Sequence, residues 1–160
     1  MPFPEIIRLS PNFEAVPAHE RLGVCFHHSV LEFEATIARL LQLESQVSYH
    51  ALIGPDGTRA TLVEDGHIAW HAGASTFLGR PRCNDFLLGL AFAGDTYATP
   101  LTAAQIDSAL DWLAPRWACH EWSPVRMIDH RQIAPGRKDD LNPAEWNRLH
   151  TAIVERFGDA

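Results

Sequence analysis

Histidine, lysine and aspartate lie close together in one stretch of the chain, DHRQIAPGRKDDLNP, which runs from Asp129 to Pro143. Proline and glycine interrupt this stretch, so we expect a loop rather than a helix. Histidine and carboxylate side chains are the ligands that a catalytic zinc ion takes, and a lysine can stabilise developing negative charge. The stretch is therefore either a solvated charged loop or part of a reactive site that includes His130, Lys138 and one aspartate.

Two further histidines, His27 and His28, follow the apolar residues GVCF at the end of a predicted strand. Consecutive side chains of a strand point to opposite faces, so at most one of the two faces a given pocket. A catalytic zinc ion takes three protein ligands and leaves a fourth position for water, and two histidines with one carboxylate meet that count. The spacing is not the helical H-E-x-x-H pattern, so the histidines could equally be ordinary core or rim residues.

The composition indicates one compact acidic domain without a nucleic-acid surface. The 160 residues are 46% hydrophobic and 21% charged, with a formal net charge of −7. No cluster of lysine and arginine could neutralise phosphates, so we expect neither a nucleic-acid partner nor a membrane partner, and we expect a monomer. The three cysteines are far apart and lack C-x-x-C spacing, which favours a reducing compartment over a disulfide framework.

The first residues, MPFPEIIRLSPNF, lack the basic start and the apolar stretch of a signal peptide. No apolar run approaches the ~20 residues of a membrane span. We therefore expect a protein that is cytoplasmic as synthesised. Residues 1–20 are punctuated by proline and predict an extended arm, with the folded domain at residues 21–160.

The order of the predicted elements indicates an α/β fold in which helices flank a mixed central β-sheet. Alternating or continuous apolar runs predict strands at 23–29, 48–54, 58–64, 86–94 and 125–129. Two capping boxes and an Asn-Pro cap predict helices at about 29–43, 102–115 and 142–157. The second helix should end or kink at Pro115, and a glycine-rich loop with aromatic residues occupies 67–85.

Four stretches resemble the zinc-dependent N-acetylmuramoyl-L-alanine amidases of the amidase-2 type: VCFHHS, SYHALIGPDGT, AWHAGASTFLGRPRCNDFLLGLAFAG and HRQIAPGRKDD. That family includes cytosolic anhydromuropeptide amidases, T7-phage-type lysozymes and peptidoglycan recognition proteins. The resemblance runs from about Gly23 to Phe157, and the third stretch is especially similar to the cytosolic amidases. It implies hydrolysis of the amide bond between the lactyl group of N-acetylmuramic acid and L-alanine, in peptidoglycan or in soluble muropeptides.

The resemblance also implies roles for individual residues. It assigns His27, His130 and Asp140 to one Zn²⁺ ion, with the carboxylate ten positions after the second histidine as in the family. Lys138 matches the family's catalytic lysine, whose charge would stabilise the oxyanion that forms when the amide is attacked. Asp139 is then a solvent-facing neighbour.

One position departs from the cytosolic amidases. Those proteins carry a glutamate general base in the strand that reads GLAFAG here, and Ala91 stands at its position. The T7-type lysozymes and the catalytic recognition proteins carry a tyrosine at the start of the preceding hairpin instead, and Tyr49 matches it. Tyr49 could hold the attacking water and polarise the carbonyl, although a phenol with an ordinary pKa of about 10 is a poor base. The alternative is that Tyr49 only packs as an aromatic residue at the edge of the strand.

The loop from Trp70 to Asp85 is expected to line the substrate groove. The candidate substrate-binding residues are Trp70, His71, Arg82 and Asn84 of this loop, and His28, which lies next to His27 in the sequence. Arg82 resembles an arginine that anchors a stem-peptide carboxylate in the cytosolic amidases, a task suited to its forked donors, and its alternative is a surface arginine. The hairpin turn reads Gly54-Pro55 where those amidases carry arginines, so the same diaminopimelate recognition is not implied.

Two functional hypotheses follow. The first is a zinc amidase, which the complete ligand set and the lysine favour. The second is a muropeptide-binding or muropeptide-sensing domain that has lost hydrolysis, which the alanine at position 91 allows. The setting stays open among cytosolic muropeptide recycling, a phage lysin that reaches the cell wall, and a secreted effector.

Overall fold

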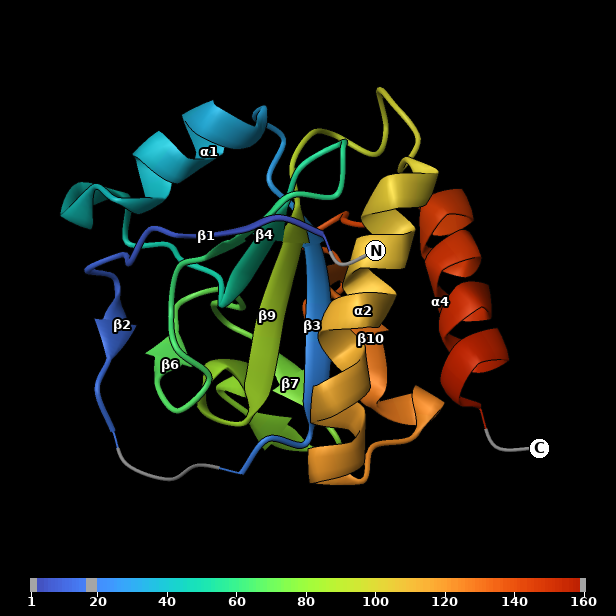
Figure 1. The fold of residues 1–160 in the computed structure, drawn as a ribbon. Helices are drawn as coiled ribbons and strands as arrows, with labels where there is room; N and C mark the ends of the chain where they lie inside the picture. Colours follow the sequence, from blue (N-terminus) through green and yellow to red (C-terminus); the bar gives the residue numbers. More distant parts are fainter. Residues whose placement is uncertain (1–2, 17–19, 159–160) are drawn as a thin grey trace.

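The computed structural model describes residues 3–16 and 20–158 of the chain. They form an α/β fold around one six-stranded sheet in the order β1-β5-β4-β9-β3-β10 (Figure 1). The strands of this sheet are β1 (Glu5–Ile7), β3 (Gly23–His28), β4 (Ala51–Ile53), β5 (Arg59–Thr61), β9 (Leu87–Phe92) and β10 (Met127–Asp129). Strands β4 and β5 pair antiparallel and all other neighbours pair parallel, so the predicted mixed sheet is confirmed.

Helices cover both faces of the sheet. Helices α2 (Ala103–His120) and α4 (Pro143–Phe157) lie side by side on one face, and α1 (Phe33–Leu40) packs on the opposite face (Figure 1). The remaining elements are short: β2 (Phe13–Glu14), β6 (Ile68–Ala69), β7 (Thr76–Phe77), β8 (Arg80–Pro81), α3 (His130–Ile133) and single 3₁₀ turns at 43–45, 83–85 and 124–126. Among the helices described, none is both long enough and apolar enough to cross a lipid bilayer.

The central strands β3 and β9 are buried along their whole length. Side chains of a strand alternate between faces, so Val24 and Phe26 enter the core beneath α2 and α4. Cys25 enters the core on the other face of the sheet, and His27 follows it on that face. In the register of the sheet His27 lies beside Ala91 of β9. The sheet thus presents His27 and the side chain at position 91 on the same face.

Helix α1 begins later than the sequence predicts. Its N-cap is Glu32, whose carboxylate accepts hydrogen bonds from the backbone N–H of Ala35 at 2.6 Å and of Glu34 at 3.3 Å. Ser29 does not cap the helix, because its hydroxyl contacts the hydroxyl of Thr36 and the carbonyl of Leu31. The helix ends at Leu40, before the predicted end near residue 43.

Helix α2 starts with the predicted capping box of Thr102 and Gln105, and it continues through Pro115 to His120. Proline removes one intrahelical hydrogen bond, which is why the sequence predicts an end or a kink there. Tertiary contacts hold the last turns, since the ring of Trp117 stacks on Phe157 of α4 with centroids 4.5 Å apart. Packing between the two helices therefore outweighs the local cost of the proline.

Part of the N-terminal arm is built into the fold. Its residues 5–7 form the edge strand β1, and Asn12 is fully buried. The amide nitrogen of Asn12 faces four acceptors at 3.0–3.3 Å, which are Leu40 O, Gln42 O, Ser45 Oγ and Val47 O. These bonds fasten the arm to the end of α1 and to the segment that leads to Tyr49. Residues 1–2 and 17–19 of the predicted arm lie outside the described residues.

A buried histidine joins three segments beneath the site. His50 Nε2 donates to the carbonyl of His67 at 2.8 Å, and its Nδ1 accepts from the backbone N–H of Gly89 at 3.0 Å. A neutral ring satisfies both partners, and burial lowers the pKa of His50 to about 3. Protonation of this ring would break the bond to Gly89.

Replacing Asn12 by alanine should lower the free energy of unfolding by about 2 kcal/mol, because several buried carbonyls would lose their donor. Urea unfolding monitored by circular dichroism measures the change. Asn147, which is exposed on α4, provides the matched control, and Asn147→Ala should change stability by less than about 0.5 kcal/mol. Equal effects of the two substitutions would show that Asn12 does not anchor the arm.

Acid should destabilise the fold in part through His50. In the unfolded chain its pKa is about 6.5, so between that value and the folded value only the unfolded state binds the proton. Stability should therefore fall as the pH drops below about 6.5, by about 2 kcal/mol more in the wild type than in His50→Gln at pH 5. Urea unfolding at pH 7.5 and pH 5 tests this, and parallel pH profiles of the two proteins would refute it.

Candidate functional site

The structure brings His27, His130 and Asp140 together. His27 is the last residue but one of β3, and His130 follows β10 directly, so the parallel pairing of these strands places both histidines at the same edge of the sheet. The two Nδ1 atoms lie 3.0 Å apart. Asp140 completes the group, with Oδ1 3.3 Å from His130 Nδ1 and Oδ2 3.7 Å from His27 Nδ1. All three residues are buried.

Protein contacts fix the hydrogen positions on the rings. His130 Nε2 lies 3.0 Å from the carbonyl oxygen of Ala72, and a carbonyl can only accept, so this nitrogen carries the hydrogen. His71 Nε2 likewise donates to the carbonyl of Leu87 at 3.0 Å, which leaves its Nδ1 as an acceptor. His27 Nε2 donates to that Nδ1 at 3.0 Å. In the neutral rings both facing Nδ1 atoms of His27 and His130 therefore carry lone pairs.

Two lone pairs at 3.0 Å beside a carboxylate require a cation between them. That cation is a proton or a metal ion. Burial first, and then the charges of His130 and His71, hold the pKa of His27 well below its ordinary value, so a proton is disfavoured there. Burial alone would raise the pKa of Asp140, but the hydrogen bond and the charge that a protonated His130 ring offers outweigh burial, so the pKa of Asp140 lies below its ordinary value. Two imidazole nitrogens and a carboxylate fit the donor set that zinc prefers.

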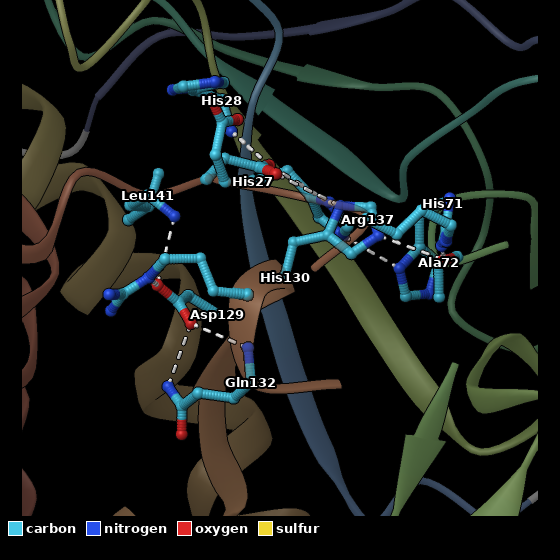
Figure 2. A network of polar contacts seen from close by, with 12 residues as sticks. His27, His28, His71, Ala72, Asp129, His130, Gln132, Arg137 and Leu141 are labelled. Carbon is cyan, nitrogen blue, oxygen red and sulfur yellow. Dashed lines mark hydrogen bonds and ion pairs between the residues drawn. The ribbon is translucent and has the colours of Figure 1, made fainter. Parts of the chain in front are cut away.

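Asp129 supports this arrangement from below. It is fully buried and forms the N-cap of α3, accepting from the backbone N–H of Gln132 at 3.3 Å. Its other oxygen accepts from the backbone N–H of Leu141 at 3.1 Å and from Arg131 Nε at 2.6 Å (Figure 2). One carboxylate thus fixes the chain next to His130 and next to Asp140.

The structure separates residues that are neighbours in the sequence. Asp139 is exposed, whereas Asp140 is buried and accepts from the backbone N–H of His28 at 3.2 Å. The side chain of His28 borders the cavity beside the ligands, but its Nδ1 accepts from the backbone N–H of Thr96 at 3.1 Å. His28 is therefore held on the side of the strand away from His130, as strand geometry predicts.

A cavity of about 530 Å³ opens beside the three ligands. Tyr49 lines it, and its ring lies 5.1 Å from that of His27 between centroids. Burial first, and then the nearby Asp140, raise the pKa of Tyr49 above its ordinary value, so its hydroxyl stays protonated and can donate a hydrogen bond. Ala91 packs in the same core cluster as Tyr49 and carries no polar atom toward the site.

Lys138 also lines the cavity and is exposed. Its backbone N–H donates to the carbonyl of Ala134 at 3.0 Å, which closes a tight turn after α3. The charge of Lys138 contributes to lowering the pKa of His27, so the ammonium group acts electrostatically on the ligand set. The position suits a group that stabilises negative charge in the cavity.

The residues of the 70–85 loop fall into different places. Trp70 lines the cavity beside the ligands and also a second cavity of about 160 Å³. Arg82 and Asn84 border only that second cavity, and the Arg82 side chain is 75% exposed with Nε 3.3 Å from Asp85 Oδ2. The Oδ1 of Asn84 accepts from the backbone N–H of His71 at 3.0 Å and of Ala72 at 2.8 Å, so it shapes the loop.

His71, one of the predicted substrate-binding residues, lines the cavity. Its Nδ1 contacts His27 Nε2 and its Nε2 contacts the carbonyl of Leu87, both at 3.0 Å. The ring packs against β9 at Gly89, where a Cβ atom would lie 2.5 Å from His71 Cγ. Glycine at this position of the strand makes room for the ring.

Besides Asp129, two residues that hold the site together are not predicted from the sequence. The main-chain oxygen of Ala72 orients His130, and no side-chain type signals a main-chain acceptor. Arg137 donates to the carbonyls of Ala72 and Ala74 and ties the loop of Lys138 to the loop of His71. The sequence offers a weak signal for Asp129 only, since aspartate directly before a short helix favours an N-cap.

Comparison with known proteins relates most of the chain to one family. The family model described as N-acetylmuramoyl-L-alanine amidase matches residues 18–143. The chain is 38% identical over 123 residues to the 1,6-anhydro-N-acetylmuramyl-L-alanine amidase AmpD of Escherichia coli (strain K12), covering 76% of this chain and 63% of AmpD. It is 29% identical over 170 residues to the N-acetylmuramoyl-L-alanine amidase AmiD of the same organism, covering 96% of this chain and 61% of AmiD. The chain thus spans less than two thirds of the length of these relatives.

Solved structures agree with this relation. A crystal structure of a selenomethionine derivative of AmpD superposes with a TM-score of 0.77 at 25% identity, covering 92% of this chain and 93% of that one. The E. coli AmiD complex with anhydro-N-acetylmuramic acid-L-Ala-D-γ-Glu-L-Lys superposes with a TM-score of 0.72 at 28% identity, covering 84% of this chain and 58% of that one. The chain belongs to the amidase-2 family of N-acetylmuramoyl-L-alanine amidases.

Proposed function

We propose that this chain hydrolyses the amide bond between the lactyl group of N-acetylmuramic acid and L-alanine, in peptidoglycan or in soluble muropeptides. The observation that carries the proposal is the ligand set, in which two buried lone pairs and one carboxylate converge beside an open cavity. The related AmiD structure holds a muropeptide that contains this bond, which supports the substrate class.

We assign one Zn²⁺ ion to His27, His130 and Asp140, because their donor types and their fixed hydrogen positions fit that metal. When bound, zinc supplies a Lewis acid that polarises a carbonyl and makes water nucleophilic near neutral pH. The protein orients both imidazole rings through Ala72 and His71, so each ring presents its Nδ1 toward the site.

Lys138 and Tyr49 both line the cavity and act on the substrate there. As water adds to the amide carbon, negative charge grows on the carbonyl oxygen, and the ammonium group of Lys138 stabilises it. The C–N bond then breaks, and the proton that the attacking water loses ends on the leaving amine. The protonated hydroxyl of Tyr49 donates a hydrogen bond to the same oxygen or orients the attacking water. Tyr49 cannot take the proton of that water at neutral pH, because its pKa is raised.

A second candidate function is a muropeptide-binding or muropeptide-sensing domain without hydrolysis. The observation in its favour is Ala91, which lies beside His27 in the sheet and offers no group that could accept a proton. The two candidates share the cavity and differ in turnover. Release of free peptide from purified muropeptides decides between them.

Purified protein should release peptide from anhydromuropeptides or from sacculi, a chelator should abolish the release, and added zinc should restore it. Parallel assays on intact sacculi and on soluble anhydromuropeptides show which substrate is preferred. Binding of muropeptide without any release, in zinc-loaded protein, would favour the sensing domain.

Lys138→Ala should lower kcat by about 10²–10³-fold while the zinc content stays near one per chain, because the lysine stabilises charge and does not hold the metal. Metal analysis and a peptide-release assay provide the two readouts. Lys138→Arg keeps the charge and should recover part of the loss. If Lys138→Ala protein loses its zinc, the role assigned to the lysine is incorrect.

Tyr49→Phe removes one hydroxyl and should lower kcat by about tenfold or more, with the unfolding free energy and the zinc content close to those of the wild type. The comparison separates a reacting hydroxyl from a packing ring, since phenylalanine preserves the ring. Wild-type kcat in this variant would assign Tyr49 to packing alone.

A further inference from the structure

Arg137 reaches from the loop that carries Lys138 to the loop that carries His71. Its Nη2 donates to the carbonyl of Ala72 at 2.6 Å and to that of Ala74 at 2.8 Å, and its Nε donates to Ala74 at 3.2 Å. Gly73, between the two acceptors, has φ of 61°, and a Cβ atom there would lie 3.0 Å from Arg137 Nη2. The glycine therefore leaves room in the turn for the guanidinium group.

The carbonyl oxygen of Ala72 is shared. It accepts from Arg137 Nη2 and from His130 Nε2 at 3.0 Å (Figure 2). A carbonyl oxygen has two lone pairs, so it can serve both donors at once. Any movement of Ala72 moves the acceptor that sets the orientation of His130. The guanidinium group thus binds the same oxygen atom that holds His130 Nε2 and so directs His130 Nδ1 toward the other ligands.

The main chain links Arg137 to the lysine next to it. The backbone N–H groups of Arg137 and Lys138 both donate to the carbonyl of Ala134, at 3.1 and 3.0 Å. Gly136 precedes them with φ of 79°, so the turn depends on a residue that tolerates this conformation. Within residues 3–16 and 20–158 the Lys138 ammonium group makes no hydrogen bond or ion pair, so its place is set by this main chain.

We propose that Arg137 is a positioning residue, which clasps the 72–74 turn to the loop of Lys138 and thereby holds His130 for the metal and Lys138 for the substrate. The guanidinium group is suited to the task because its planar donors serve two carbonyls at fixed angles. A lysine would supply a single point of attachment. The part of the inference that concerns Lys138 rests on the proposed function, and the part that concerns His130 rests on metal binding alone.

Arg137→Ala should weaken zinc binding by about 10–100-fold, as losses around metal ligands commonly do, and should lower kcat more than it changes KM. Arg137→Lys should fail to restore either quantity, because it cannot span both carbonyls. Zinc affinity is measured by competition with a chelating dye, turnover by peptide release, and folding by thermal unfolding of the metal-free protein. Guanidinium ion at millimolar, non-denaturing concentration should recover part of the lost zinc affinity in Arg137→Ala.

Arg8→Ala is the matched control. Arg8 is also exposed and also donates to a main-chain carbonyl, that of Ile7 at 3.2 Å, but it lies on β1's side of the sheet outside the cavity. Its substitution should leave zinc affinity and kcat at wild-type values. The control shows whether the loss of one arginine charge, by itself, changes metal binding.

Gly73→Ala should disturb the same contact by changing the turn instead of the arginine. The added carbon meets the guanidinium group, and the positive φ disfavours alanine. It should weaken zinc binding in the same direction as Arg137→Ala. The double variant should lose no more than the worse single variant, because both break one clasp.

Wild-type zinc affinity in Arg137→Ala overturns the proposal. So does a loss of zinc affinity that Arg137→Lys restores fully, since that result would assign the effect to charge. A loss of apparent affinity that is explained entirely by a lower melting temperature of the metal-free protein also overturns it, in favour of a purely structural tie. If the wild type binds zinc but releases no peptide, the proposed function fails while the affinity comparison still decides the role of Arg137.

Discussion

The site depends on one unfavourable contact that the fold enforces: two imidazole nitrogens with lone pairs face each other at 3.0 Å. The protein could relieve the repulsion by turning either ring, but each ring is fixed at its other nitrogen. His130 is held by the carbonyl of Ala72, and His27 is held by His71, which is itself held by the carbonyl of Leu87. Buried surroundings strengthen these bonds and penalise a bound proton. The arrangement fits a cation held between the two nitrogens and the carboxylate.

The rest of the structure serves to keep these rings in place. Parallel pairing of β3 with β10 brings both histidines to one edge of the sheet, and a glycine in β9 leaves the volume that the His71 ring needs. Asp129 then fixes the two chain segments on either side of α3. Main-chain oxygens and a buried carboxylate hold the rings, and a glycine leaves space for one of them. Each of these features is common in proteins, and together they preorganise three donor atoms.

Reasoning from the sequence succeeds where a local pattern decides the structure. The apolar runs locate β3 and β9, the capping box locates the start of α2, and the Asn-Pro cap locates α4. It fails where tertiary contacts override the local pattern, as when α2 continues past Pro115 or when Glu32 takes the place of Ser29. The candidate ligands are visible because their side-chain types are distinctive. The roles of Ala72, Gly89 and His71 are not visible, because they depend on a main-chain atom, on empty space and on which ring nitrogens are already bound.

Lys138 is the only lysine in the 160-residue sequence, and all other basic side chains apart from histidine are arginines. It is also exposed at the wall of the cavity. Amine-directed chemistry, such as acylation or reductive methylation, therefore has just one side-chain target in this chain besides the α-amino group. Coupling to an amine-reactive resin or dye would attach the protein at the wall of its cavity, whereas thiol coupling at the exposed Cys119 would leave the cavity open. A fluorine-labelled or ¹³C-methylated Lys138 would likewise give a single resonance that reports directly on what enters the cavity.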